Sequence, residues 1–420
     1  MKRILSLVCV LCLVFPLAAA ALAEEGLSGT IRYSTWGSVT EKEINEQIIA
    51  AFEEEYPGCT VELEYIPSDY VQSIDTMFLG GDAPDVIYGH PHYFAAWAKE
   101  GLLMDLTEFY AQNEDYFYDD RFTTELYSRY IYKGQNIATV NGSDTFLLFY
   151  NKDMFDEAGV AYPTDTWTWD DFLAAAKALT KTDGDMKQYA MVMNNLQPII
   201  YSFGGRYYDD MENPTQVVFN SPETVEALQF VYDCIYTYGV SPDTTDSELL
   251  GGSFATGRVA MCLDGAWGIA NYANCDFNWD VAYIPLKNAE DEHITSAYYA
   301  GYAVNAFTEN PELAMEFAKY FQSERAQMLL AGQGLITVID ESVATSDEVL
   351  KGENAPEHAY LRVETVANSV GGYANLTNLA EVQDKALTPH FDQLVLGTIQ
   401  PADCAQQIHA IMEELLPAGI

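Results

Sequence analysis

Residues 138–180 read ATVNGSDTFLLFYNKDMFDEAGVAYPTDTWTWDDFLAAAKALT, and the expected fold rests first on this stretch. Its polar segment 141–144 predicts a turn, and the apolar run 145–150 has the length and composition of a buried strand. A short helix is expected over 151–159, because a glycine stands where helices commonly end. A longer helix follows, with Thr168 as its cap and two aspartates at the positive end of its dipole.

The region before this stretch alternates between strand and helix patterns. Strands and helices are expected in turn at 28–36, 40–56, 60–66, 69–79 and 85–88. Thr40 is the expected cap of the first helix, whose apolar residues fall on one face. Alternation at this spacing predicts an α/β domain with a mostly parallel sheet.

Four motifs along the chain resemble one known family. They are Gly-x-Ala-Pro-Asp-Val at 81–86, Tyr-Asn-Lys-Asp at 150–153, Gly-x-x-Ala-Met-x-x-x-Gly-x-Trp at 257–267 and Pro-Glu-x-Ala-x-x-Phe-x-x-x-Phe at 311–321. In this combination and order, the chain resembles the extracellular solute-binding proteins of ABC importers, of the carbohydrate-uptake (maltose-binding-like) type. The resemblance extends over nearly all of the chain after residue 23.

The resemblance implies an α/β fold of the two-lobed periplasmic-binding-protein type. Each lobe is expected to be a mostly parallel sheet flanked by helices, and a hinge joins the two. The expected boundaries assign 24–140 and 303–348 to the N-terminal lobe, and 141–300 and 349–420 to the C-terminal lobe. The chain is expected to cross between lobes near 139–144 and 298–302. The Asn141-Gly142 turn would absorb the rotation there, because glycine accepts dihedrals that other residues resist.

The first 23 residues predict export. They combine a basic start, an apolar centre and small residues at Ala21 and Ala23, the pattern of a signal peptide cleaved before Glu24. A membrane anchor is the alternative, but the apolar stretch is short and contains Pro16. No cysteine stands where lipidation needs one. The mature protein is therefore expected to be free of a lipid anchor, in the periplasm or outside the cell.

The chain is strongly acidic, with 63 Asp and Glu against 20 Lys and Arg, and its formal net charge is −43. Such a surface repels nucleic acid and anionic lipid, which excludes both as partners. Hydrophobic residues make up 49% of the chain. This is enough apolar surface for ordinary cores, so the acidity does not indicate disorder.

Cysteine and histidine patterns indicate neither a disulfide framework nor a metal site. The cysteines after the signal segment are Cys59, Cys234, Cys262, Cys275 and Cys404. Their odd number forbids complete pairing, so buried free thiols are expected, with a Cys262–Cys275 disulfide as the alternative. His90 and His92 supply only half of a metal site, so no metal and no other cofactor is expected.

Candidate ligand residues follow from the chemistry of sugars. A sugar ring has C–H faces that stack on aromatic rings, and hydroxyls that pair with carboxylates and amides. Side chains of both kinds stand at predicted strand ends, where open α/β sheets bind ligands. The expected ligand-binding residues are Trp36, His90, His92, Asp144, Tyr201, Asp264, Trp267, Tyr299, Tyr302 and Tyr373. The resemblance puts Trp267 at a position that stacks on sugar in relatives, whereas Trp167 and Trp169 are expected to pack a helix start.

The resemblance implies a binding protein rather than an enzyme. Such a protein captures a sugar or oligosaccharide between its lobes and delivers it, as a monomer, to the transmembrane subunits of an ABC permease. The sequence contains no nucleophile elbow, zinc-protease motif or phosphate-binding glycine loop. Two alternatives remain. One is a secreted glycoside hydrolase with a (β/α)₈ barrel, because acidic residues are abundant. The other is a ligand sensor for a membrane receptor.

Overall fold

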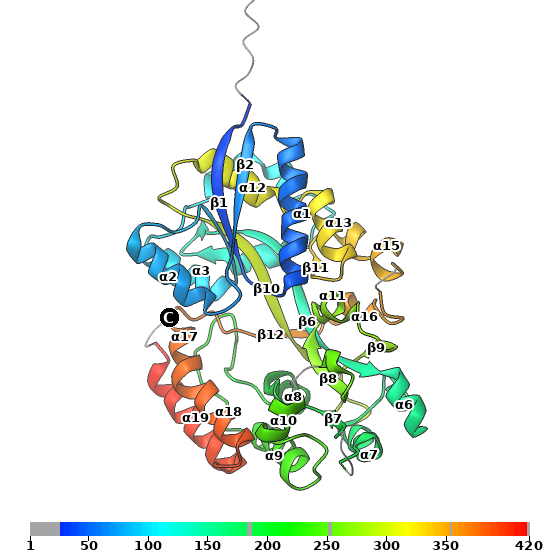
Figure 1. Ribbon diagram of the computed structural model, residues 1–420. Helices are drawn as coiled ribbons and strands as arrows, with labels where there is room; N and C mark the ends of the chain where they lie inside the picture. Colours follow the sequence, from blue (N-terminus) through cyan, green and yellow to red (C-terminus); the bar gives the residue numbers. More distant parts are fainter. Residues whose placement is uncertain (1–25, 183–186, 251–253, 353–354, 418–420) are drawn as a thin grey trace, which may run out of the picture.

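The computed structural model describes residues 26–182, 187–250, 254–352 and 355–417, which form two lobes (Figure 1). The upper lobe in Figure 1 contains the N-terminal strands, and the lower lobe contains the C-terminal helices. Two long strands, β6 (Thr139–Asn151) and β10 (Thr295–Val304), run from one lobe into the other. The expected signal peptide, residues 1–23, lies outside the described residues.

The sheet of the first lobe contains three parallel strands, and β10 extends this sheet beside β3. These strands are β1 (Gly29–Thr35), β2 (Cys59–Tyr65) and β3 (Val86–Gly89). Strand β1 pairs in parallel with β2 and β3, and β10 is antiparallel to β3. The helices of this lobe are α1 (Val39–Glu55), α2 (Tyr70–Gly80), α3 (Pro91–Lys99), α4 (Thr107–Gln112), α5 (Glu114–Phe117), α12 (Pro311–Tyr320), α13 (Glu324–Gly332), α14 (Glu341–Ala344) and α15 (Asp347–Leu350), with a 3₁₀ turn at Thr124–Tyr130 and a small hairpin, β4 (Ile131–Tyr132) with β5 (Gln135–Asn136).

The second lobe has a mixed sheet, in contrast to the mostly parallel sheet that the sequence predicts. Its strands are β7 (Tyr189–Met191), β8 (Val259–Gly265) and β9 (Trp279–Ala282). Strand β6 is antiparallel to both β8 and β9, and only β7 and β8 pair in parallel. The helices are α6 (Lys152–Ala158), α7 (Trp169–Leu179), α8 (Leu196–Ser202), α9 (Pro222–Tyr236), α10 (Thr244–Leu250), α11 (Gly268–Tyr272), α16 (Leu361–Glu364), α17 (Leu379–Val382), α18 (Thr388–Val395) and α19 (Pro401–Leu415), with a 3₁₀ turn at Phe254–Thr256 and a π-helical turn at Gln383–Leu387.

Each lobe has its own hydrophobic core. The first core contains buried residues between 31 and 140 and between 297 and 349. The second contains buried residues between 146 and 412. In the first, the rings of Phe52 and Phe317 lie 5.0 Å apart and join α1 to α12. Separate cores allow the lobes to move relative to one another, because few packed side chains must part when they do.

The predicted cap at Thr168 and the predicted helix end at Gly159 are confirmed, whereas the predicted cap of the first helix is wrong. The Thr168 hydroxyl accepts a hydrogen bond from the Asp171 N–H, and the Asp171 carboxylate accepts one from the Thr168 N–H. Gly159 ends α6 with a φ of 66°, as predicted. Helix α1 begins after Ser38, so the predicted cap at Thr40 is wrong. Ser38 and Glu41 form the reciprocal pair of bonds that satisfies the free N–H groups at this start.

The predicted turn at 141–144 is wrong, because these residues belong to strand β6. Gly142 pairs with Ala300 of β10 on one side and with Val338 of the short strand β11 (Thr337–Val338) on the other. A Cβ on Gly142 would lie 2.3 Å from the Thr337 carbonyl oxygen. The glycine is thus needed for close approach of two strands, not for a reversal of the chain. Strand β10 has an irregular register here, between Ala300 and Gly301.

Candidate functional site

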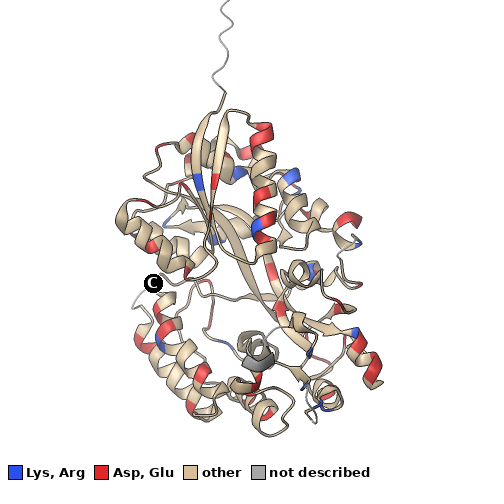
Figure 2. Ribbon diagram, in the orientation of Figure 1, with Lys and Arg blue, Asp and Glu red and all other residues tan. Residues whose placement is uncertain are grey.

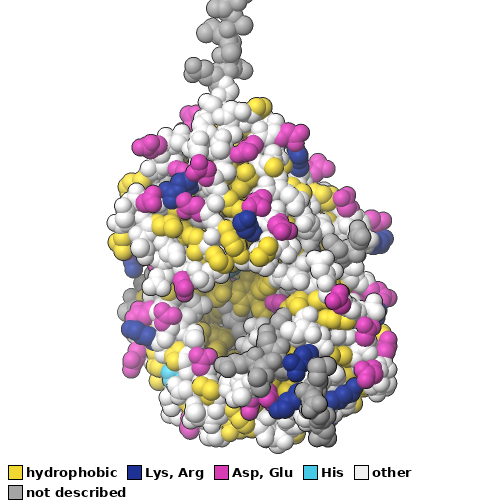
Figure 3. All heavy atoms as spheres, viewed as in Figure 1, with side chains coloured by type: hydrophobic (Ala, Val, Ile, Leu, Met, Phe, Trp, Pro, Cys, Tyr) yellow, Lys and Arg dark blue, Asp and Glu magenta, His cyan; other side chains and the backbone are white. Residues whose placement is uncertain are grey.

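A cavity of about 460 Å³ lies between the lobes and is lined by residues of both. Figure 3 shows a hollow between the upper and lower parts of the molecule, with many hydrophobic side chains on its walls. Seven of the ten predicted ligand residues line the cavity. They are Trp36, His90, Asp144, Trp267, Tyr299, Tyr302 and Tyr373. The strand ends identified from sequence are therefore brought together by the fold.

The other three predicted residues are not among those that line the cavity. His92 is buried in α3, and its ring lies 4.0 Å from that of Tyr93 and 4.3 Å from that of Tyr373. Tyr201 is fully buried, and its hydroxyl donates a hydrogen bond of 3.2 Å to the Gly371 carbonyl oxygen. Asp264 accepts hydrogen bonds from the Tyr272 hydroxyl at 2.7 Å and the Gly265 N–H at 2.8 Å.

Several cavity residues were not predicted from the sequence. The polar ones are Thr35, Ser38, Glu41, Asn45, Asn141, Asn195 and Asn271, and Tyr88 and Tyr298 add further rings. Most of them stand on helices or inside strands, away from the strand ends on which the prediction concentrated. One signal was available: Glu41 stands three residues after Ser38, which is the capping-box spacing.

The first-lobe wall is an aromatic cluster around Trp36. The Trp36 ring lies 4.7 Å from Tyr70, 4.4 Å from Tyr88 and 5.2 Å from His90, in tilted or edge-on arrangements. The Nδ1 of His90 donates a hydrogen bond of 2.5 Å to the Tyr299 carbonyl oxygen. Burial lowers the pKa of His90 to about 4, so its ring is neutral at pH 7.

Glu41 is held at the edge of this wall by the loop before α1. Its Oε2 accepts a hydrogen bond of 2.6 Å from the Ser38 N–H. Gly37 has a φ of 123°, and a Cβ there would collide with the Glu41 carboxylate, so the loop requires a glycine. Burial, with the nearby carboxylates of Asp264 and Asp144, raises the pKa of Glu41 to about 7.

The second-lobe wall presents Trp267. Its ring packs edge-on against Phe146 at 5.5 Å and Tyr298 at 5.9 Å. Gly265 lies beneath the ring, where a Cβ would be 2.2 Å from the Trp267 ring carbon Cζ3. These contacts fix the plane of the indole, which lines the cavity and leaves apolar surface available for a ligand.

Asp144 lies between the lobes in a partly satisfied network. Its Oδ1 accepts hydrogen bonds of 2.9 Å from the Thr337 N–H and from the Thr337 hydroxyl. Arg362, also buried, has its Nη2 3.8 Å from the same oxygen. Burial raises the pKa of Asp144 to about 6, although Arg362 and Thr337 oppose part of the rise. Its other oxygen, Oδ2, is buried without a hydrogen-bond partner.

A second contact between the lobes lies beside the cavity. Arg129 of the first lobe forms an ion pair with Glu212 of the second. The Arg129 guanidinium also lies 3.9 Å from the centre of the Tyr299 ring. Strand β12 (Ser369–Gly371) pairs with β10 close by and leads to Tyr373. In this region the lobes are joined by an ion pair, a cation–π contact and strand pairing.

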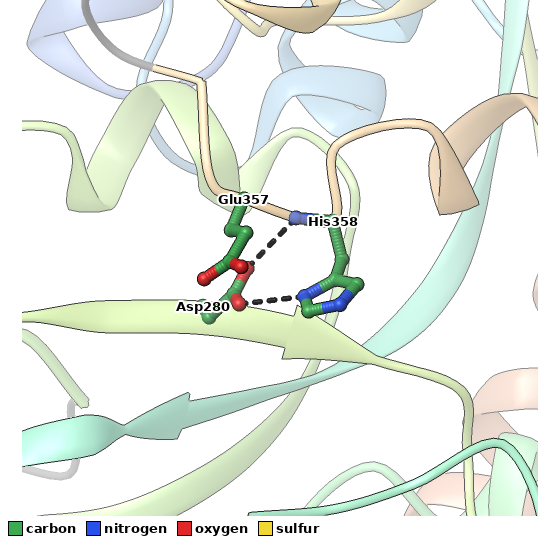
Figure 4. A group of neighbouring side chains, drawn as sticks. All are labelled: Asp280, Glu357 and His358. Carbon is green, nitrogen blue, oxygen red and sulfur yellow. Dashed lines mark hydrogen bonds and ion pairs between the residues drawn. The ribbon is translucent and has the colours of Figure 1, made fainter.

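Figure 4 shows a group with metal-ligand chemistry away from the cavity, made of Asp280, Glu357 and His358. The Nδ1 of His358 donates to Asp280 Oδ2 at 2.7 Å, and its backbone N–H donates to Oδ1 at 3.1 Å. Glu357 is paired with Lys152 at 3.1 Å. These bonds attach the segment after residue 355 to strand β9, and the charges already have partners.

The remaining surface and thiols agree with the composition. Figure 2 shows Asp and Glu spread over the outer helices of both lobes, with Lys and Arg sparse. The cysteines of the described chain are free thiols, so the Cys262–Cys275 alternative is wrong. Within the described segments, no helix combines the length and apolarity that crossing a membrane requires.

Comparison with known proteins identifies similar chains and folds. Residues 36–328 match the family model described as bacterial extracellular solute-binding protein. A galactooligosaccharide-binding protein of Bacillus subtilis is 23% identical over 324 residues, which are 73% of this chain and 72% of that protein. An arabinooligosaccharide-binding protein of the same bacterium is 26% identical over 344 residues, 76% of each. An ABC substrate-binding protein from Listeria monocytogenes in complex with cycloalternan has a TM-score of 0.82 at 24% identity, covering 93% of this chain and 99% of that one. The likeness confirms the predicted two-lobed α/β fold.

Proposed function

Because the chain belongs to the bacterial extracellular solute-binding proteins, we propose that it captures a sugar or oligosaccharide for an ABC importer. The observation that carries the proposal is the cavity between the lobes, where aromatic rings alternate with carboxylates and amides. Rings match the C–H faces of a sugar, and the polar groups match its hydroxyls. Relatives named as galactooligosaccharide- and arabinooligosaccharide-binding proteins support the same ligand class.

The proposed ligand contacts are divided between two walls. Trp36, His90 and Tyr302 would contact the sugar from the first-lobe side, and Trp267 and Asp144 from the second. The full proposed set keeps the predicted residues Trp36, His90, His92, Asp144, Tyr201, Asp264, Trp267, Tyr299, Tyr302 and Tyr373. Of these, His92 and Tyr201 would support the segment that presents Tyr373, and Asp264 would act through its charge near the cavity.

The proposed mechanism is closure of two lobes without a covalent step. The lobes would comprise 24–140 with 303–348, and 141–300 with 349–420; the separation of the hydrophobic cores supports this division. A ligand that contacts both walls binds the closed form more tightly and so shifts the equilibrium toward it. The closed, loaded form would then dock, as a monomer, on the transmembrane subunits of the permease.

Catalysis is not part of the proposal. A glycoside hydrolase would need two carboxylates placed on either side of one glycosidic bond. The relatives are named as binding proteins, which favours binding over hydrolysis. Incubation with each bound oligosaccharide should leave its reducing-end content unchanged, and a steady rise would show an enzyme. A sensor role would instead appear as capture of a membrane receptor in place of a permease.

Export is proposed from the sequence pattern at the start of the chain. The mature protein would begin at Glu24 and carry no acyl chain, outside the cytoplasm, in agreement with an extracellular family. Intact-mass measurement of the native protein tests this. A mass that includes residues 1–23, or an added lipid, would contradict it.

The central experiment is a thermal-shift screen against neutral mono- and oligosaccharides, followed by X-ray scattering with the best binder. A sugar that binds only the folded state raises the melting temperature. The radius of gyration should fall on binding, because the lobes close. If no sugar raises the melting temperature, the proposed ligand class is wrong. If a tight binder leaves the scattering curve unchanged, the closure mechanism is wrong.

A further inference from the structure

Carboxylates from both lobes are gathered at the cavity. Glu41, on α1 of the first lobe, and Asp144, on β6, line it directly. Asp264, at the end of β8 in the second lobe, lies close enough for its charge to raise the pKa of both. Burial raises the pKa of Asp264 as well. Negative charge is thus concentrated where the lobes face one another.

Positive charge is nearly absent from the same place. Among the described residues that line the cavity, none is Lys or Arg. Arg362 lies behind Asp144, with its Nη2 3.8 Å from Oδ1, and partly balances that one carboxylate. His90 lines the cavity but is neutral at pH 7, because burial holds its pKa near 4. Glu41 and Asp264 therefore have no cationic partner among the contacts of the structure.

The carboxylates are held in place by local structure. Ser38 donates its N–H to Glu41, while Tyr272 and Gly265 donate to Asp264. The Oδ2 of Asp144 is buried without any hydrogen-bond partner, although the residue lines the cavity. A buried acceptor without a donor costs stability unless a ligand supplies one. The site is therefore built for a ligand with strong hydrogen-bond donors.

Closure makes this arrangement more costly. Glu41 belongs to one lobe and Asp264 to the other, so closing an empty cavity brings like charges together in a poorly hydrated space. A cation between them would convert this repulsion into attraction, with each lobe binding it. The surrounding rings, among them Trp36 and Trp267, also attract cations through their faces.

We propose that the captured ligand is an amino sugar, or an oligosaccharide containing one, whose ammonium group binds between Glu41 and Asp144, close to the charge of Asp264. This inference rests on the proposed sugar-binding function and narrows its ligand class. The same charges exclude uronates and sugar phosphates, because a second anion would add to the repulsion. Charge neutralisation then triggers closure.

Protons compete with the ammonium group for Glu41. The titratable or charged groups around it are Asp144, Asp264, Tyr88, His90 and, behind Asp144, Arg362. Near pH 5.5 Glu41 is protonated in the empty cavity, since its pKa is about 7. Binding of an amine must then expel that proton. The preference for the amine is therefore larger at pH 7.5 than at pH 5.5.

The test is calorimetry at both pH values with matched probes. They are glucose, glucosamine and glucuronate; galactose, galactosamine and galacturonate; and the glucosamine trimer beside its N-acetylated, uncharged counterpart. At pH 7.5 an amine should bind at least about tenfold more tightly than its neutral match, the equivalent of one pKa unit. The uronates should not bind.

Two variants locate the effect. Glu41→Gln should abolish the preference for the amine, so that amine and neutral match bind with equal affinity. Glu43→Gln, which removes the same charge from an exposed position on the same helix, should keep the preference.

The outcomes separate the two proposals. A neutral sugar that binds more tightly than every amine overturns the inference and leaves sugar capture standing. An amine preference that survives in Glu41→Gln also overturns it. If neither neutral sugars nor amines bind, sugar capture itself is wrong.

Discussion

Trp169 and Trp267 lie in two regions of the second lobe. The two side chains differ in how much of each is buried and hydrogen-bonded by the protein. Trp169 is 3% exposed, its Nε1 donates to the Ser202 hydroxyl at 2.9 Å, and its ring packs against Phe172 at 5.2 Å. Trp267 is packed edge-on by Phe146 and Tyr298 and lines the cavity. At Trp169, the ring and the indole N–H both have protein partners.

The cavity wall differs from the surroundings of Trp169. Asp144 keeps one buried oxygen without a partner, and like charges face one another across the cleft. A native protein rarely leaves such groups unpaired, because each costs free energy. The difference indicates that core side chains determine stability, whereas cavity side chains are arranged for a ligand that is not part of the chain. Substitutions in the two regions should therefore separate stability from affinity.

The largest effect is expected in the core. Trp169→Ala removes a packed ring and should lower the free energy of unfolding by about 3–5 kcal/mol. Affinity of the protein that remains folded should change little, because Trp169 does not line the cavity. Urea denaturation gives the first quantity and calorimetry the second. Trp167→Ala, at a half-buried ring two residues away, is the control and should cost less. A large loss of affinity in Trp169→Ala would contradict the proposed separation between core residues that determine stability and cavity residues that determine affinity.

At the cavity wall a substitution should change affinity more than it changes stability. Trp267→Ala should weaken binding of the tightest sugar in the panel by about 2 kcal/mol, because a stacking platform is lost. The melting temperature without ligand should stay close to that of the parent protein. Calorimetry and thermal unfolding on the same sample measure both. Unfolding of the variant, or an unchanged dissociation constant, would move Trp267 from the cavity wall to the core.

A pH series sharpens the comparison through the cavity carboxylates. The pKa values of Glu41 and Asp144 are raised to about 7 and about 6, so protonation favours the folded protein over the unfolded chain. Their contribution to stability is complete below pH 4 and is lost as pH rises through 6 and 7. Unfolding free energy should fall by about 1 kcal/mol between pH 5 and pH 8, since solvent in the cleft screens part of the effect. Glu41→Gln should flatten this slope, and Glu43→Gln should not.

The smallest effect is expected at the contact beside the cavity. Arg129→Gln removes the ion pair with Glu212 and should weaken sugar binding by about 0.5 kcal/mol, because partly exposed pairs contribute little. Added salt should weaken binding by the parent protein and have less effect on the variant. Scattering without ligand should show a slightly larger radius of gyration for Arg129→Gln. A tenfold loss of affinity would make this contact part of the ligand site.

Local sequence was sufficient for most elements and for much of the cavity. Thr168 and Gly159 set the ends of their helices through bonds and dihedrals that neighbouring residues supply. Alternating strand and helix patterns placed Trp36 and His90 at strand ends, and open α/β sheets bring such ends together. These features depend on contacts short in sequence, which a pattern of residue types can indicate.

Tertiary structure alone decided the features that depend on partners distant in the chain. Residues 141–144 have turn chemistry, yet β10 and β11 pair with them from both sides and extend β6 through the lobe crossing. The environment of Asp144 depends on Arg362, more than two hundred residues later, and that of Glu41 depends on Asp264 across the cleft. Charge, burial and register at these positions are set by where the fold places other segments. The residues next to Asp144 and Glu41 in sequence do not indicate which distant side chains will surround them. These interactions act through space rather than along the chain.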